Sequence, residues 1–152
     1  MPDLSLLVFI GICVATAMTG ILFKPGEWYK ALDKPSWTPP DWSFGPVWSV
    51  LYVMIAVAGW LVWTNLGMSG LLVLWGAQLV LNAMWSFLFF GIRRMDLAFV
   101  DVVMMWLSIA AFIVLASAAV PLAALLFVPY LIWVTIASAL NLSVWRRNPQ
   151  AA

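Results

Sequence analysis

Five long apolar segments divide the chain, and short polar or charged segments separate them. The apolar segments cover residues 4–23, 45–66, 70–91, 97–118 and 122–145. A helix of about 20 such residues crosses a hydrocarbon core of about 30 Å. The segments show no strand-like alternation, and only helices or closed barrels can cross lipid. The pattern therefore predicts an all-α integral membrane bundle of five transmembrane helices, with residues 1–152 forming a single domain.

The segment between the first two apolar stretches, residues 24–44, has a different composition. It holds four prolines, three tryptophans and six of the chain's thirteen charged residues. A connection of about twenty residues is uncommonly long for two neighbouring helices, and such loops are often functional or disordered. Tryptophan is typical of the membrane interface. We therefore expect an ordered, Pro/Trp-rich capping loop that lies over one end of the bundle.

Composition excludes several classes of function. The chain is 66% hydrophobic and only 9% charged, whereas a soluble domain is about a quarter charged. A net charge of +1 without a basic stripe gives no reason to expect nucleic acid. There is no histidine, and the single Cys13 lies in an apolar segment, where a small buried hydrophobe is expected. We expect no metal site, no cofactor and no hydrolase or ATP-driven pump.

The distribution of basic residues predicts an orientation. With five spans, the capping loop, the Arg93–Arg94 link and the Arg146–Arg147 tail lie on one face of the membrane, and all seven Lys and Arg residues belong to that face. By the positive-inside rule, the capping loop and the C-terminus of this multi-pass protein should face the cytoplasm.

Polar residues within the apolar segments are costly in lipid unless they have partners. Gln78, Asn82, Trp85 and Ser86 follow one another at steps of four, three and one, which places them along one face of a helix. Two interpretations stay open, namely hydrogen bonds between helices and a binding site. Asp101 presents the same alternatives, because Arg146, Arg147 or a loop lysine could pair with it.

Several candidate binding residues are expected at similar depths within the bilayer. Counted from the basic face at about 1.5 Å per residue, Trp48 should be shallow, Trp85 and Asp101 should lie near 8–9 Å, and Asn82 near 14 Å. Trp133 lies about 18 Å along its helix from Trp145, too far for an interfacial belt. These positions predict an apolar, aromatic-lined cavity beneath the capping loop, with few polar groups.

Several short motifs resemble those of one known family. They are KPSWTPP at 34–40, GPVW at 45–48, LNAMW at 81–85, LAFVD at 97–101 and PYLIW at 129–133. Their order and spacing resemble the translocator protein family, whose members are also called tryptophan-rich sensory proteins and peripheral-type benzodiazepine receptors. The likeness extends over residues 20–147.

The resemblance implies a five-helix bundle, often a homodimer, that binds tetrapyrroles such as protoporphyrin in a pocket beneath the first loop. For animal members it also implies cholesterol and synthetic isoquinoline carboxamide or benzodiazepine-type ligands. Carried over position by position, the pocket residues would be Tyr29, Pro39, Trp48, Tyr52, Asn82, Trp85, Ser86, Trp133 and Ala137. The cholesterol motif, an upstream Leu or Val followed by Tyr and then Lys or Arg, is missing here, so tight cholesterol binding is not expected.

Three functional hypotheses follow. The first is a receptor or transporter for tetrapyrroles with a regulatory or stress-sensing role. The second is enzyme-like, light-dependent degradation of porphyrin, in which Trp48 and Trp133 would be the redox-active residues. The third is a structural or regulatory membrane subunit. For a homodimer, the third apolar segment is favoured through Gly76 and Ala83, which lie seven residues apart on one stripe, and the first segment is the rival.

Overall fold

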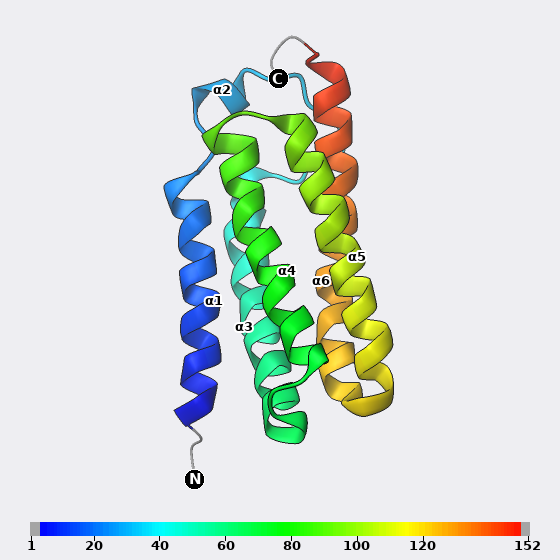
Figure 1. Ribbon diagram of the computed structural model, residues 1–152. Coiled ribbons are helices and arrows are strands. Elements are labelled where there is room, and N and C mark those ends of the chain that lie inside the picture. The colour runs from blue at the N-terminus through cyan, green and yellow to red at the C-terminus, as the bar shows by residue number, and fades with distance from the viewer. Residues whose placement is uncertain (1–3, 150–152) are drawn as a thin grey trace.

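The protein is a bundle of long helices that lie roughly side by side (Figure 1). The computed structural model describes residues 4–149. The long helices are α1 (Leu4–Leu22), α3 (Asp41–Leu66), α4 (Gly70–Ser86) with its π-helical continuation η1 (Phe87–Gly91), α5 (Met95–Ala119) and α6 (Pro121–Arg147). A single turn, α2 (Glu27–Lys30), lies in the capping loop, residues 23–40. The five spans α1, α3, α4 with η1, α5 and α6 are long and apolar enough to cross a membrane, and residues 4–149 contain no strand. The predicted all-α fold is confirmed.

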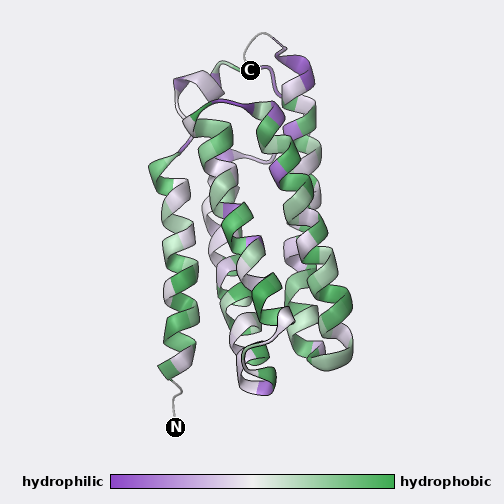
Figure 2. Ribbon diagram, in the orientation of Figure 1, coloured by the Kyte–Doolittle hydropathy of each residue, from purple (hydrophilic) through white to green (hydrophobic). Residues whose placement is uncertain are grey.

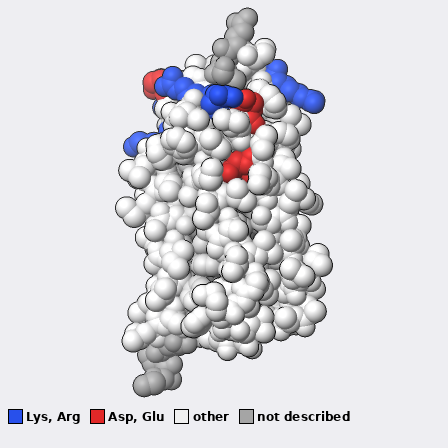
Figure 3. Space-filling view, viewed as in Figure 1, with Lys and Arg blue, Asp and Glu red and all other residues white. Residues whose placement is uncertain are grey.

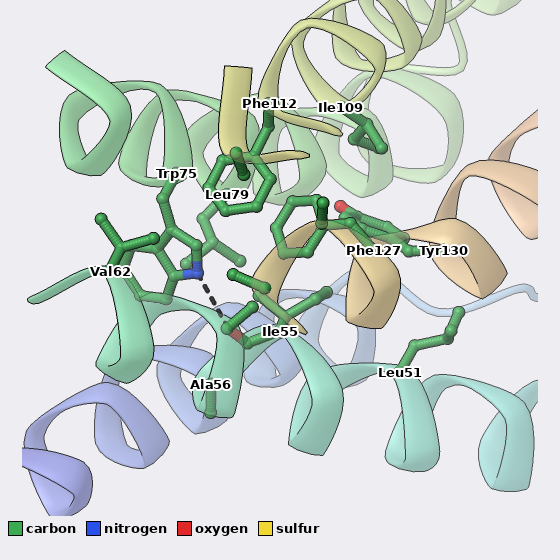
Figure 4. Packing of buried hydrophobic residues seen from close by; sticks show 14 of the residues in the cluster. Leu51, Ile55, Ala56, Val62, Trp75, Leu79, Ile109, Phe112, Phe127 and Tyr130 are labelled. Atoms are coloured by element: carbon green, nitrogen blue, oxygen red, sulfur yellow. Dashed lines mark hydrogen bonds between the residues drawn. The ribbon is translucent and has the colours of Figure 1, made fainter. Parts of the chain in front are cut away.

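The outer surface of the bundle is apolar, as lipid requires. Figure 2 shows hydrophobic residues along most of the length of the long helices, and large side chains such as Val73, Val114 and Leu125 are more than half exposed. Hydrophobicity therefore does not distinguish the inside from the outside, and the helices must associate by close packing and hydrogen bonds. The core contains stacked Phe112 and Phe127, whose ring centroids are 4.0 Å apart (Figure 4).

The capping loop does not stay at the end of the bundle. In Figure 1 it passes over the top near the end of α6 and then descends to the start of α3. Helix α3 begins at Asp41, four residues earlier than expected, after Pro40 in an extended conformation. Because α3 begins below the end of α6, Trp48 lies against the middle of α6, 6.2 Å from Tyr130 and 6.5 Å from Trp133 between ring centroids. The expectation that Trp48 is shallow was wrong.

Within the described residues, the lysines and arginines lie at the end that the capping loop covers, as Figure 3 shows for one face. Lys24, Lys30 and Lys34 are in this loop, Arg93 and Arg94 are in the link between η1 and α5, and Arg146 and Arg147 end α6. The charge separation expected from five spans is therefore present. Which face of the membrane is cytoplasmic stays a prediction.

One tryptophan holds three helices together at the opposite half of the bundle. Trp75 of α4 is 4% exposed, and its indole Nε1 donates a hydrogen bond to the Ile55 carbonyl of α3 at 2.9 Å (Figure 4). Its ring also packs edge-on against Phe9 of α1, with the centroids 5.0 Å apart. The indole lies directly over Gly59 of α3, where a Cβ atom would be 2.6 Å from Nε1. Only glycine permits this approach.

Replacing Gly59 by alanine should therefore destabilise the protein. The added methyl group would displace the Trp75 indole, and overpacking of a closely packed interior costs about 1–3 kcal/mol. We expect Gly59→Ala to lower the midpoint of thermal unfolding in detergent. Gly11→Ala in α1 is the matched control, because no atom lies within 4 Å of its Cβ position. An unchanged midpoint in Gly59→Ala would show that the indole can move freely.

Candidate functional site

A cavity of about 640 Å³ lies beneath the capping loop, between the loop-side halves of the helices. Every residue that the resemblance assigned to a pocket lines it: Tyr29, Pro39, Trp48, Tyr52, Asn82, Trp85, Ser86, Trp133 and Ala137. These residues come from the loop and from α3, α4 and α6. The structure thus brings together positions that are up to 108 residues apart in the sequence, although their part in binding stays a prediction.

Tyr29 of α2 forms the roof of the cavity and packs against η1. Tyr29 is 8% exposed, and its ring packs edge-on against Phe89 and Phe90. Lys34 folds back over it, with Nζ 4.7 Å from the centre of the Tyr29 ring and 3.0 Å from the Tyr29 carbonyl oxygen. Burial raises the pKa of the Tyr29 hydroxyl, and the negative charge of Asp41 raises it further. Tyr29 is therefore an uncharged, fixed part of the roof.

A second attachment joins the loop to the end of α6. The backbone N–H of Asp33 donates to Oδ1 of Asn148 at 3.0 Å, and Nδ2 of Asn148 donates to the Asp33 carbonyl at 2.8 Å. The same Nδ2 also donates to the Val144 carbonyl within α6. Arg147 adds an ion pair, with Nη1 3.5 Å from Oδ2 of Asp33. We call this group, Asp33 with Arg147 and Asn148, the loop clasp.

Aromatic side chains form the walls. Trp48 and Tyr52 stack in α3, with centroids 5.4 Å apart, and Trp133 of α6 meets the Trp48 ring edge-on. On the opposite side Trp85 stacks on Phe89 at 5.0 Å. The Trp85 indole is fixed because Nε1 donates to Oδ1 of Asn141 at 2.9 Å. Flat aromatic walls suit a flat, apolar ligand.

The floor is polar and consists of one chain of hydrogen bonds. The Tyr52 hydroxyl donates to Oδ1 of Asn82 at 2.9 Å, and Nδ2 of Asn82 donates to the Tyr130 hydroxyl at 2.8 Å. Tyr130 then donates to Oε1 of Gln78 at 2.8 Å, and Nε2 of Gln78 donates to the Trp75 carbonyl at 2.7 Å. Tyr52 and Asn82 also line the cavity, whereas Gln78 lies below it. The polar residues of α4 therefore form hydrogen bonds between helices, and Asn82 among them also lines the cavity.

Asp101 does not behave as either interpretation proposed. It is 5% exposed and does not line the cavity. Its Oδ2 atom has no hydrogen-bond partner in the described part of the chain, and the ion pairs there do not include it. The pairing with an arginine or loop lysine, which the sequence left open, is not formed within residues 4–149. Arg147 lies with Asp33, and Lys34 is turned to the loop backbone.

Some lining residues were not expected. They include Phe44 and Gly45 of α3, Phe89 and Phe90 of η1, Val102 and Met105 of α5, and Leu140 and Asn141 of α6. The signal for Phe89 was present, because it lies one helical turn after Trp85 on the same face. Phe44 could not be found, because the sequence placed it in the loop rather than in α3.

The described residues contain no group of three His, Cys, Asp or Glu side chains that could hold a metal ion. The fold and the site together define a class, a multi-pass α-helical membrane protein with a largely apolar, aromatic-lined cavity beneath a loop. A family model described as the TspO/MBR family matches residues 6–146. The chain belongs to this family.

Individual relatives agree with the family assignment. Protein CrtK of Rhodobacter capsulatus is 42% identical, over 93% of this chain and 91% of the relative. The tryptophan-rich sensory protein of Cereibacter sphaeroides is also 42% identical, over 93% and 90%. The translocator protein of Homo sapiens is 42% identical over 85% of this chain and 81% of its own length.

Removing the Asn148 side chain should release the loop clasp. In Asn148→Ala, the Asp33 amide loses its acceptor, so we expect its hydrogen exchange to accelerate by about tenfold, the equivalent of one or two net hydrogen bonds. Asn65→Ala is the matched control, because it also removes an asparagine side chain bonded to a carbonyl, that of Leu61, but at the far end of α3. Equal exchange at Asp33 in wild type and Asn148→Ala would contradict the clasp.

Proposed function

We propose that the protein is a receptor-like or transporter-like membrane protein that binds tetrapyrroles, such as protoporphyrin, in the cavity beneath the capping loop. One observation carries the proposal: nine residues chosen by family resemblance all line one cavity of about 640 Å³. Ligand pockets commonly measure about 300–1,000 Å³ and combine apolar walls with a few polar groups. A regulatory or stress-sensing role follows from the same resemblance.

The chemistry of the walls fits such a ligand. A tetrapyrrole is a flat aromatic ring system, and the indoles of Trp48 and Trp133 offer two surfaces at a right angle to each other. Tyr52 and Asn82 supply the hydrogen-bonding groups at the floor, and Lys30 lies at the loop end, where it can meet a ligand carboxylate. With no histidine in the chain, metal-free protoporphyrin should bind at least as well as haem. Synthetic isoquinoline carboxamide or benzodiazepine-type ligands suit the same walls.

Alanine at Trp48 or Trp133 should weaken protoporphyrin binding by about tenfold or more, roughly 1.4 kcal/mol. Each change removes an aromatic surface that contributes about 0.5–1.5 kcal/mol beyond the area it buries, so phenylalanine should retain part of the affinity. Titration of the purified protein with protoporphyrin measures the effect.

The control is Trp63→Ala, because Trp63 is exposed on α3 and does not line the cavity. Trp60 is less suitable, since it packs against the core. Unchanged affinity in both cavity variants, with folding verified, would place the binding site elsewhere. No binding of any tetrapyrrole by the wild-type protein would favour the third hypothesis, a structural or regulatory subunit.

Light-dependent degradation of porphyrin is the second candidate, and the contact between Trp48 and Trp133 favours it. Their ring centroids are 6.5 Å apart, so a ligand in the cavity can touch both indoles. An indole is easier to oxidise than a benzyl ring. Porphyrin loss under illumination should therefore fall in Trp48→Phe and Trp133→Phe even where binding survives, as identification of the products would show. Equal loss in the wild-type protein and both variants would exclude the indoles as redox partners.

We also propose that the protein forms a homodimer and that its capping loop faces the cytoplasm. A homodimer through α4 is supported by Gly76, whose Cβ position has no atom within 4 Å, so a second helix can approach closely there. The position of the basic residues at the loop end supports a cytoplasmic location for the loop and the C-terminus.

A further inference from the structure

A second hollow lies on the outer face of the bundle, at the seam between α3 and α6. It is a groove of about 440 Å³, and Trp133 lines both this groove and the inner cavity. Its lining is Pro46, Val47, Val50, Leu51 and Met54 of α3 with Pro129, Ile132 and Trp133 of α6. No lining residue is charged, so the groove can hold only an apolar molecule or part of one.

Two prolines explain why the helices leave a groove here. Pro46 and Pro129 both lie inside helices. Each lacks a backbone N–H and so interrupts the hydrogen bonding of its own helix. Their side chains are short rings, which cannot fill the space between two helices as Leu or Phe would. The seam between α3 and α6 is therefore thin at this level, and one side chain lies between the groove and the inner cavity.

That side chain is Trp133. It is half-buried, and it contacts Phe44 and Trp48 edge-on with centroids 5.6 and 6.5 Å away. Within residues 4–149 its indole N–H has no hydrogen-bond partner. Three other indoles are held, because Trp75, Trp85 and Trp106 donate to Ile55, Asn141 and Thr135. Trp133 can therefore change its side-chain rotamer without breaking a hydrogen bond.

The loop end of the cavity is held by more contacts. To open it, the protein would have to break the two hydrogen bonds and the ion pair of the loop clasp. It would also have to remove Tyr29 from its contacts with Phe89 and Phe90. Each net hydrogen bond contributes about 0.5–1.5 kcal/mol, so movement of the whole loop costs more than rotation of one unbonded indole.

We propose that hydrophobic ligands reach the cavity from within the bilayer, through the seam between α3 and α6, and that the Trp133 side chain is the gate. The proposal rests on the proposed function, namely that the cavity binds tetrapyrroles. A flat, largely apolar macrocycle dissolves in the lipid, meets the groove between Pro46 and Pro129, and enters as the indole turns aside. The ligand then lies against the inner face of the same indole that admitted it.

The test compares the rates of binding with the affinity. Val50 lines the groove and is 59% exposed, so Val50→Trp fills the entrance without touching the cavity. We expect the association and dissociation rate constants of protoporphyrin, followed by its own fluorescence with protein in lipid vesicles, to fall together by about fivefold. The dissociation constant should stay within about twofold, because a change at the entrance alters the barrier and not the bound state.

Two variants serve as controls. Val53→Trp adds the same side chain to α3 at a similarly exposed position, 63%, outside the groove, and should leave both rate constants unchanged. Asn148→Ala loosens the loop and should also leave them unchanged. Normal rates in Val50→Trp would show that the ligand does not enter through this seam, and faster association and dissociation in Asn148→Ala would place the entrance at the loop. Either result would overturn the proposal. If wild-type vesicles bind no protoporphyrin, the proposed function itself fails.

Discussion

The hydrogen-bonded chain from Tyr52 through Asn82, Tyr130 and Gln78 to the Trp75 carbonyl is the interaction on which the cavity depends. Lipid offers no partner for a polar group, so each of these side chains must find one inside the protein. Every link donates in the same direction, and such chains strengthen their members cooperatively. Because the chain joins α3, α4 and α6, it fixes their spacing at the floor. Above the floor the three helices are free to leave a hollow.

The capping loop covers one end of this hollow. By descending beside the bundle before α3 begins, it brings the first turns of α3 against the middle of α6. Trp48 therefore meets Trp133 rather than the interface, and Phe44 becomes part of the wall. The loop clasp and the packing of Tyr29 hold the loop in that course. If a loop of the same length stayed at the end of the bundle, α3 would begin higher. Trp48 would then not reach Trp133, and the loop end of the cavity would be uncovered.

Much of this could be predicted from the sequence, for a physical reason. The length of each apolar segment and the positions of Lys and Arg between the segments can be read directly from the sequence. Because a helix must be about 20 residues long to cross the bilayer, these lengths predict five spans. The depth of Trp48 could not be predicted in this way, because the first residue of α3 was assumed to lie at the membrane surface. The state of Asp101 also escaped prediction, since Arg147, which could have paired with it, forms an ion pair with Asp33 instead. The residues carried over by family resemblance all line the cavity, whereas the estimate of depth along the helices misplaced Trp48.

The tryptophans show how one residue type can serve opposite purposes in the same bundle. Where an indole N–H has a partner on another helix, as in Trp75, Trp85 and Trp106, the side chain is fixed in position and joins two helices. Where the described part of the chain gives the indole none, as in Trp133, packing against neighbouring rings and the hydrophobic core holds it. A hydrogen-bonded indole costs a bond to move, and an unbonded one only its packing. The distribution of partners therefore separates the tryptophans that hold the bundle together from those, such as Trp133, that can move without breaking a hydrogen bond.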